Sequence, residues 1–476
     1  MGAGASASAA GLSKEEAVLL VGKIYDEHAA DGGALTAEQV QTFAAASLGE
    51  PENGHACLAP LIAASRPAFA ALNATYVPSA ASDPPARFVV GFIADQDQAS
   101  KLDATHWESD FAYGCLTRDG AASYRFELSG EDKVVTTAGD KSGRGAEYSV
   151  LEYYAGKLVT CCDRTGDVDA IVPTAAAHAA AHAAGAKFAV EPIMEPAAPG
   201  DGDGAAAPRR MSLRLGDGSK PKPLKCEWST LRAGKLLVGS TGKERTDDAG
   251  AVVHEGECWV KSIDKTWAVE HDDWRARYAA LREAAQCPHG AGYMIHEAGR
   301  WSDVHARWFF LPRKLSREPY DEVKDERKCC NLFISATDTF DAAAIGDGEG
   351  GGGRDILAQP VLDHRPLRGC SDFFFIPGTN DTHIFVTRTE ETNEGAVNTY
   401  TAVIDLEGHV LMPEALLKAD RKFEGAAILD EYLEHDHLRD TDLFLRTSAI
   451  VVAAGGGAED DAGAVAVRPA EPSPQR

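Results

Sequence analysis

Basic side chains and long apolar runs are both scarce in this chain of 476 residues. Lys and Arg number 47 against 73 Asp and Glu, which gives a formal net charge of −26. A surface this acidic repels phosphate backbones, so the composition argues against nucleic-acid binding. No stretch of about 18 strongly apolar residues occurs, which excludes a membrane-spanning helix. The remaining composition is that of an ordinary globular protein rather than a fibrous or wholly disordered chain.

Cysteine patterns typical of metal or redox sites are also missing. The ten cysteines contain no C-x-x-C pair, which argues against a zinc ribbon or a thioredoxin-type site. Cys161-Cys162 and Cys329-Cys330 are adjacent, and neighbouring residues of a strand point to opposite faces. We therefore expect no bond within either pair and interpret most cysteines as small buried residues.

The two ends of the chain differ in composition from its middle. Residues 1–12 predict a flexible segment without a visible secretory signal, and they begin MGAGAS, which fits the pattern for myristoylation of Gly2. One acyl chain would give reversible membrane contact. Residues 13–82 predict a helical extension with a hairpin over 14–46 that lacks the oxygen ligands of a calcium loop. Residues 455–476, rich in Gly, Ala, Asp and Pro, predict a disordered tail.

Residues 87–430 predict an all-β domain. Short β-rich runs such as RFVVGFIAD, KLVTCC and DFFFIP recur with turn signals between them, which favours a sandwich, a barrel or a propeller. Two stretches of biased amino-acid composition interrupt these runs. Residues 173–223 are predicted to be disordered in part, with a strand returning near Phe188, and residues 346–353 form a glycine loop.

An internal repeat distinguishes between these folds. Residues 149–159 read SVLEYYAGKLV and residues 227–237 read EWSTLRAGKLL, so both predict a strand, an A-G-K turn and a second strand. Further copies start at Glu297, Ser371 and Glu424. Five such units predict a five-bladed β-propeller around a central channel.

Each unit begins with an oxygen-bearing residue. If the repeats are radial, these positions surround one axis, and the carboxylates among them repel one another unless a cation binds. Three carboxylates supplemented by hydroxyl, carbonyl or water oxygens suit Ca²⁺, which tolerates irregular geometry. The alternative is that these residues are polar ends of solvated strands. The predicted calcium-binding residues are Ser149, Glu227, Glu297, Ser371 and Glu424.

Longer motifs between about Arg87 and Leu429 resemble one known family. The motifs RFVVGFIADQD, CDRTG, GYMIHE, RWFFLPRK, DERKCCNL and KFEG are similar to those of the soluble calcium-activated nucleotidases, or apyrases. The resemblance implies a five-bladed propeller with central Ca²⁺, the same five metal positions, and Ca²⁺-dependent hydrolysis of nucleoside di- and triphosphates, UDP and GDP being favoured. One departure is Cys162, which stands where the family has an acidic residue.

The resemblance also bears on location and assembly. Vertebrate relatives enter the secretory pathway through an N-terminal anchor, whereas the start of this sequence favours a cytoplasmic or, after myristoylation, a membrane-associated protein. The location therefore stays open. The expected partners are nucleoside di- and triphosphates, and a homodimer is one option for the assembly.

Phosphoanhydride hydrolysis needs neutralised phosphates. Basic side chains in Gly-containing loops and in the stretch 313–328 predict phosphate contacts. The alternative to phosphate binding for residues 313–328 is a solvated loop whose basic and acidic side chains form salt bridges with one another. The predicted phosphate-binding residues are Arg144, Arg164, Lys243, Arg313 and Arg327.

The reaction also needs a placed water, which a carboxylate can orient or deprotonate. Asp95 and Asp97 follow an apolar run, and Asp163 stands beside Arg164. We predict that Asp95 and Asp163, followed by Asp97, act on the water, the alternative being that each caps a turn.

The sequence leaves more than one candidate for the nucleobase site and for the function of the protein. Trp308 is expected to pack between blades, and the wider set of candidates for stacking a base is Trp228, Trp274, Trp301 and Trp308. The chain could instead be a Ca²⁺-propeller hydrolase of another substrate, such as a lactone. It could also be a non-catalytic interaction propeller stabilised by Ca²⁺.

Overall fold

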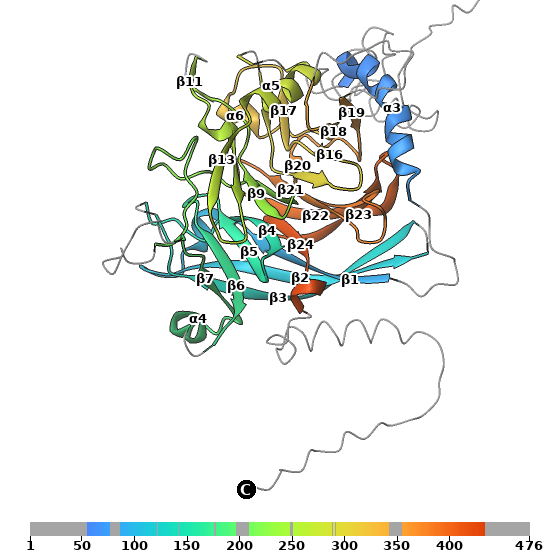
Figure 1. The fold of residues 1–476 in the computed structure, drawn as a ribbon. Coiled ribbons are helices and arrows are strands. Elements are labelled where there is room, and N and C mark those ends of the chain that lie inside the picture. The colour runs from blue at the N-terminus through green and yellow to red at the C-terminus, as the bar shows by residue number, and fades with distance from the viewer. Residues whose placement is uncertain are drawn as a thin grey trace, which may run out of the picture.

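The computed structural model describes residues 55–76 and 86–433, except 121, 141, 176–177, 197–208, 248–250, 288, 291 and 342–354. Strands are the predominant regular secondary structure of the described chain (Figure 1), which confirms the all-β class. The predicted myristoylation pattern, the hairpin over 14–46 and the tail over 455–476 lie outside the described residues.

Twenty of the described strands form five antiparallel groups of four. The first group contains β1 (Ala86–Ala94), β2 (Trp107–Asp119), β3 (Ser123–Thr136) and β24 (Phe423–Ile428). The second contains β4 (Tyr148–Tyr154), β5 (Lys157–Cys162), β6 (Val168–Pro173) and β7 (Phe188–Pro192). The third contains β8 (Trp228–Arg232), β9 (Lys235–Gly239), β12 (Trp259–Ile263) and β13 (Val269–Asp273).

The last two groups follow the same plan. The fourth contains β15 (Gly299–Ser302), β16 (Arg307–Phe310), β18 (Leu332–Ala336) and β19 (Ile356–Pro360). The fifth contains β20 (Arg368–Phe375), β21 (His383–Glu391), β22 (Val397–Asp405) and β23 (Val410–Ala419). Two small two-stranded sheets pair β10 (Arg245–Thr246) with β11 (Val252–His254), and β14 (Tyr293–Ile295) with β17 (Lys314–Ser316).

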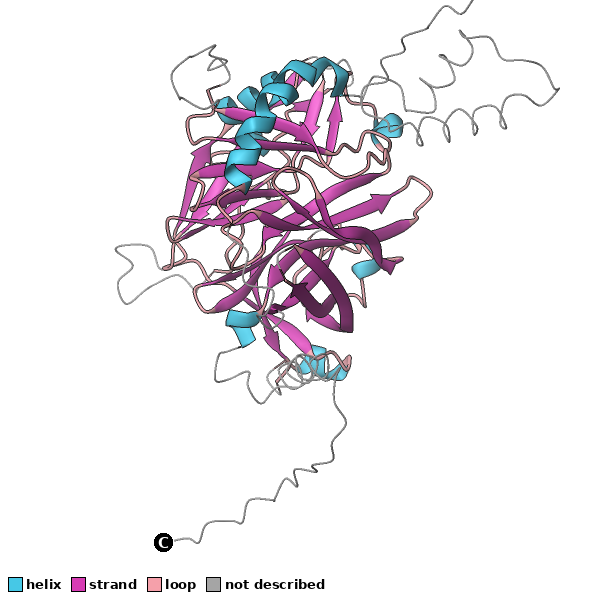
Figure 2. Ribbon diagram, turned by 90° about the vertical axis from the view of Figure 1, so that its right-hand side faces the viewer, coloured by secondary structure: helices cyan, strands magenta, loops and turns pink. Residues whose placement is uncertain are grey.

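Helical segments lie at the periphery of the sheets (Figure 2). The α-helices are α3 (Ala59–Asn73), α4 (Ala179–Ala183), α5 (Arg275–Ala284), α6 (Glu322–Asp325) and α7 (Asp430–Leu433). Short 3₁₀ segments are η1 (His55–Leu58), η2 (Asp97–Ser100) and η3 (Gly256–Cys258).

The two A-G-K turns that the repeat predicted are present. Ala155 and Gly156, with φ of 49° and 78°, connect β4 to β5, and Ala233 and Gly234, with φ of 49° and 74°, connect β8 to β9. Positive φ at both central residues defines a type I′ turn, whose twist matches that of an antiparallel pair.

One strand of each group lies at the centre of the molecule. β24 packs against β4 and β20, β4 also packs against β8, and β15 packs against β8 and β20. These contacts form a closed ring of five inner strands. At the periphery, β3 pairs in parallel with β7 through Val134 opposite Phe188, which joins the first two groups into one eight-stranded sheet. The sheets alone therefore do not establish a five-bladed propeller.

Apolar side chains fill the spaces between the groups. Trp228 of the third group packs edge-to-face against Trp308 of the fourth, with 6.3 Å between ring centroids. Helix α3 covers the edge strand β19, since the Ser65 hydroxyl accepts the Ala358 N–H at 3.0 Å and Phe69 stacks on Phe333. An edge strand covered in this way offers no free ladder to another chain.

Two absences expected from the sequence concern membrane helices and disulfides. No helix within the described ranges combines the length and apolarity needed to cross a membrane. The ten cysteines, all inside the described residues, are free, and nine of them are buried. The adjacent cysteine pairs are unbonded, as expected.

Candidate active site

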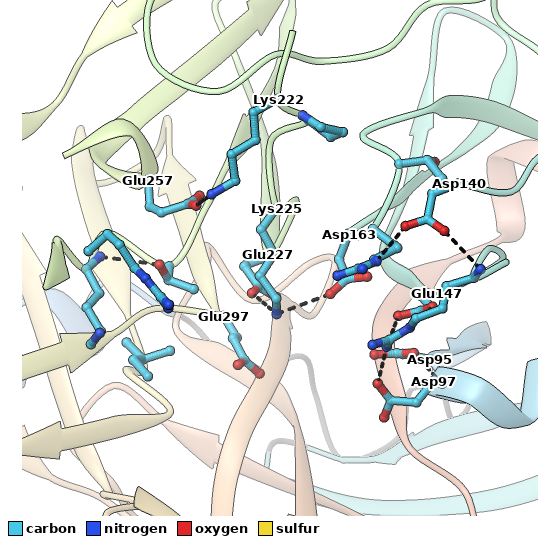
Figure 3. Close-up of a pocket in the computed structure, with 18 of the residues that line it drawn as sticks. Asp95, Asp97, Asp140, Glu147, Asp163, Lys222, Lys225, Glu227, Glu257 and Glu297 are labelled. Carbon is cyan, nitrogen blue, oxygen red and sulfur yellow. Dashed lines mark hydrogen bonds and ion pairs between the residues drawn. The ribbon is translucent and has the colours of Figure 1, made fainter. Parts of the chain in front are cut away.

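A cavity of about 1220 Å³ lies where several inner strands begin. Glu227 directly precedes β8, Glu297 lies two residues before β15, and Lys422 directly precedes β24. Figure 3 shows acidic and basic side chains from several strands pointing into this space. The antiparallel groups thus deliver side chains from distant parts of the sequence to one end of the ring.

Eight charged residues form what we call the central cluster. Each of its carboxylates is at most 9% exposed, and the five are Asp95, Asp163, Glu227, Glu297 and Glu424. Its three cations are Lys225, Arg313 and Lys422. Buried charges at this density are stable only when they are paired or bind an ion.

Each cation of the central cluster bridges two carboxylates. The Lys422 ammonium lies 3.0 Å from Asp95 Oδ2 and 3.1 Å from Glu424 Oε1. Arg313 Nη1 lies 2.8 Å from Glu424 Oε1 and also pairs with Glu297.

Lys225 makes the third bridge. The Lys225 ammonium lies 3.1 Å from Asp163 Oδ2 and also pairs with Glu227. The bridges therefore connect carboxylates that follow β1 and β5 to those that precede β8 and β15 and to Glu424 within β24.

Burial dominates the electrostatics of the central cluster. It raises the pKa of Asp95, Asp163, Glu227 and Glu297, although the neighbouring lysines and Arg313 act in the opposite direction. For Glu424, burial also acts to raise the pKa, but Lys422 and Arg313 hold it at about 2. Glu424 is therefore the carboxylate whose negative charge is most strongly stabilised.

The donor set of the central cluster fits a divalent cation. Five carboxylates face three cations, so two negative charges are left without a counter-charge. Two buried oxygens, Glu227 Oε2 and Asp163 Oδ1, have no hydrogen-bond partner among the described residues. Hard oxygen ligands with excess negative charge are what Ca²⁺ and Mg²⁺ prefer, and irregular geometry favours Ca²⁺.

The structure brings four of the five predicted metal-binding residues into this region. Glu227, Glu297 and Glu424 belong to the central cluster, and Ser149 on β4 donates its hydroxyl to Glu424 Oε2 at 3.0 Å. Ser371 on β20 is fully buried and donates to the Phe423 carbonyl at 3.1 Å; like Ser149 and Glu424, it is not among the residues that line the cavity. Ser371 thus lies behind the cluster, next to the residue that precedes Glu424.

A second acidic group lies beside Asp95. Carboxylate oxygens of Asp95, Asp97 and Glu147 lie within 4.8 Å of one another. Arg144 neutralises two of them, since its Nη2 lies 2.8 Å from Asp97 Oδ1 and its Nε donates to Glu147 Oε1 at 2.7 Å. Of the predicted catalytic acids, Asp95 and Asp163 are therefore bridged by lysines of the cluster, whereas Asp97 pairs with Arg144.

Four of the five predicted phosphate-binding residues line the cavity. They are Arg144, Arg164, Lys243 and Arg313. Arg164 pairs with Asp140 at 2.9 Å, and burial lowers the pKa of Lys243. Arg327 is exposed and is not among the residues that line the cavity.

Sequence reasoning missed Lys225, Lys422, Glu147 and Glu391, all of which line the cavity. The first three could have been found, because each stands two residues before a predicted metal residue, a spacing that puts both on one side of an extended chain. Glu391 ends β21 and contacts Arg313 and Lys422 at 3.2 and 3.7 Å. No local pattern marks it.

Known proteins resemble this chain over the same region. A sequence model of the apyrase family, described as "Apyrase", matches residues 95–186 and 201–429. Soluble calcium-activated nucleotidase 1 of Rattus norvegicus is 35% identical over 343 residues, 71% of this chain and 73% of the relative. An apyrase of Cimex lectularius is 32% identical over 71% of this chain and 82% of that protein. Apyrase apy-1 of Caenorhabditis elegans is 31% identical over 71% of this chain and 84% of that protein.

The ranges matched by the family model contain every residue of the central cluster. These matches place the protein among nucleotide-hydrolysing enzymes. The chain belongs to the apyrase family, which confirms the resemblance noted in its motifs.

Proposed function

We propose that this protein is a Ca²⁺-dependent hydrolase of nucleoside di- and triphosphates, with UDP and GDP favoured, built on a five-bladed β-propeller. The closed ring of inner strands, with one strand from each of five four-stranded groups, supports the propeller. In this interpretation the eight-stranded sheet is two blades whose outer strands, β3 and β7, meet.

The excess negative charge of the central cluster carries the calcium proposal. The proposed ligands are Ser149, Glu227, Glu297, Ser371 and Glu424, with the unpaired oxygen of Asp163 beside them. When bound, Ca²⁺ supplies positive charge to the phosphate oxygens as a Lewis acid.

The cations around the cluster would bind the substrate phosphates. Lys225 and Lys422 each contact carboxylates on the cavity wall, and their ammonium groups can also donate to phosphate oxygens. Lys243, Arg144 and Arg164 also line the cavity. Charge neutralisation with fixed geometry supplies most of the catalysis in phosphoryl transfer.

Asp95 and Asp163 are the proposed acceptors of the proton from the attacking water. Burial raises both pKa values, which makes each carboxylate a better base than an exposed aspartate. Asp163 Oδ1 has no hydrogen-bond partner among the described residues, so it is free to orient a water. Asp97, held by Arg144, would position that arginine.

The test is release of inorganic phosphate from UDP, GDP and ATP by the purified protein, with Ca²⁺, with Mg²⁺ alone and with a calcium chelator. We expect release with Ca²⁺ and a loss of at least a hundredfold with the chelator, because the substrate charge is then no longer neutralised. Equal release without Ca²⁺ contradicts the metal proposal. Thermal stabilisation by Ca²⁺ with no turnover would indicate the non-catalytic alternative, and turnover of a lactone alone would indicate the other hydrolase.

A further inference from the structure

The four tryptophans predicted as candidates for base stacking lie away from the cavity in this structure. Trp228, Trp274 and Trp308 are at most 1% exposed and pack against one another in a core cluster. Trp301 is half-buried, and the Arg232 guanidinium lies 4.2 Å from its ring centroid. None of the four lines the cavity.

A smaller cavity adjoins the main one and has an aromatic wall. Its volume is about 640 Å³, within the usual range for small-molecule sites. Lys243, Glu244, Arg245 and Tyr320 line both cavities, so the two meet at these residues. A ligand with its phosphates in the main cavity could therefore extend its other end past Tyr320.

Tyr320 is exposed but held in place. It is 42% exposed and packs edge-to-face on Tyr293, with 5.4 Å between ring centroids. Tyr293 is fixed in turn, because its hydroxyl donates to Asp325 Oδ1 at 2.6 Å. The next residue, Asp321, caps α6 by accepting the N–H groups of Val323 and Lys324. A ring that is held by Tyr293 and still has an exposed surface loses little conformational entropy when it binds a ligand.

Lys243 connects this ring to the phosphate region. Its ammonium lies 4.2 Å from the Tyr320 ring centroid, a cation–π distance. Lys243 also lines the main cavity. The junction thus combines a π surface with a cation, which is the pairing needed where a nucleoside meets its phosphates.

From this arrangement we infer that Tyr320 is the stacking surface for the nucleobase, with Lys243 at the junction between nucleoside and phosphates. The inference rests on the proposed function and adds the base subsite to it. The carboxylates and cations of the central cluster would then act on phosphates whose position the stacked base fixes.

The test separates base binding from phosphate binding. Tyr320→Ala should raise the KM for UDP and GDP about tenfold, because it removes one base–aromatic stack. The inhibition constant of inorganic pyrophosphate, which has no base, should stay within about twofold. Tyr320→Leu, which keeps bulk but not the π surface, should behave like the alanine variant, and Tyr320→Phe should stay near wild type. Val304→Ala, at a 56% exposed residue that lines neither cavity, is the control and should leave both constants unchanged.

Two results overturn the inference: an unchanged KM in both Tyr320→Ala and Tyr320→Leu, or an equal rise in the KM and in the pyrophosphate constant. Failure of the proposed function is a separate result, namely no phosphate release from any nucleotide by the wild-type protein. In that case calorimetric binding of UDP to wild type and to Tyr320→Leu decides the base subsite. Binding that is weakened at least about tenfold in the variant supports the base subsite. Equal binding to the two proteins, or no detectable binding of UDP to the wild-type protein, refutes it.

Discussion

The central cluster depends on a spacing of two residues along the extended chain. The positions two residues before the predicted metal residues are Glu147, Lys225, Ile295, Gly369 and Lys422. The glycine among them leaves space for Arg313, since a Cβ at Gly369 would lie 2.4 Å from Arg313 Cγ. The period of a strand could have predicted Lys225 and Lys422. The space that Gly369 leaves for Arg313 could not be predicted, because Arg313 belongs to another unit of the repeat.

The base role of Asp95 is testable by a single-atom change. Asp95→Asn keeps the shape of the side chain but removes its negative charge and most of its basicity, so we expect kcat to fall by about 10²–10⁴-fold. Phosphate release under saturating nucleotide measures the effect, and the melting temperature checks the fold. Asp97→Asn is the control: its side chain is 48% exposed, and a smaller loss is expected. Near-wild-type turnover of Asp95→Asn would remove Asp95 from the base role.

A second group of buried charges, centred on Arg300, lies between the inner strands. Arg300 on β15 lies 2.5 Å from Glu152 on β4 and 3.0 Å from Asp372 on β20. Its Nε donates to the Phe373 carbonyl at 2.6 Å. Its Nη2 also donates to the Ala426 carbonyl of β24 at 3.4 Å, so the side chain connects four of the five inner strands. Sequence reasoning did not select Arg300, because one arginine in GRWS shows nothing of partners 148 and 72 residues away.

Removal of this guanidinium should destabilise the whole ring. Arg300→Met leaves the carboxylates of Glu152 and Asp372 buried without their counter-charge, and we expect unfolding to cost about 3–5 kcal/mol less. Urea denaturation measures the difference. The matched control is Arg125→Met, which breaks the exposed pair with Asp119 and should change stability by about 1 kcal/mol or less. Equal effects from the two variants would contradict a structural role for Arg300.

The first and last strands of the domain pair with each other. β24 lies beside β1, with Val90 opposite Ile428, so the first group takes one strand from the end of the domain. Strands, turns and the repeat could be predicted from the sequence because they depend on local patterns. The composition of this group and the pairing of β3 with β7 could not, because both depend on contacts between distant residues.

A shortened chain tests this closure. A protein that ends at Ala419 lacks β24, which leaves the edge of β1 unpaired and removes Lys422 and Glu424 from the central cluster. We expect it to lose cooperative thermal unfolding and to aggregate through the exposed edge. A protein that ends at residue 454, before the predicted tail, should melt within a few degrees of the full chain. A cooperative transition of normal enthalpy in the shorter protein would refute the role of β24.

The same pairing sets an order of events during synthesis. On the ribosome β1 emerges about 330 residues before its partner β24, which at usual elongation rates is on the order of half a minute. During that interval the nascent chain contains Asp95 but not the lysine that faces it. The edge of β1 is therefore a site at which a chaperone is expected to hold the growing polypeptide until translation of the domain is complete.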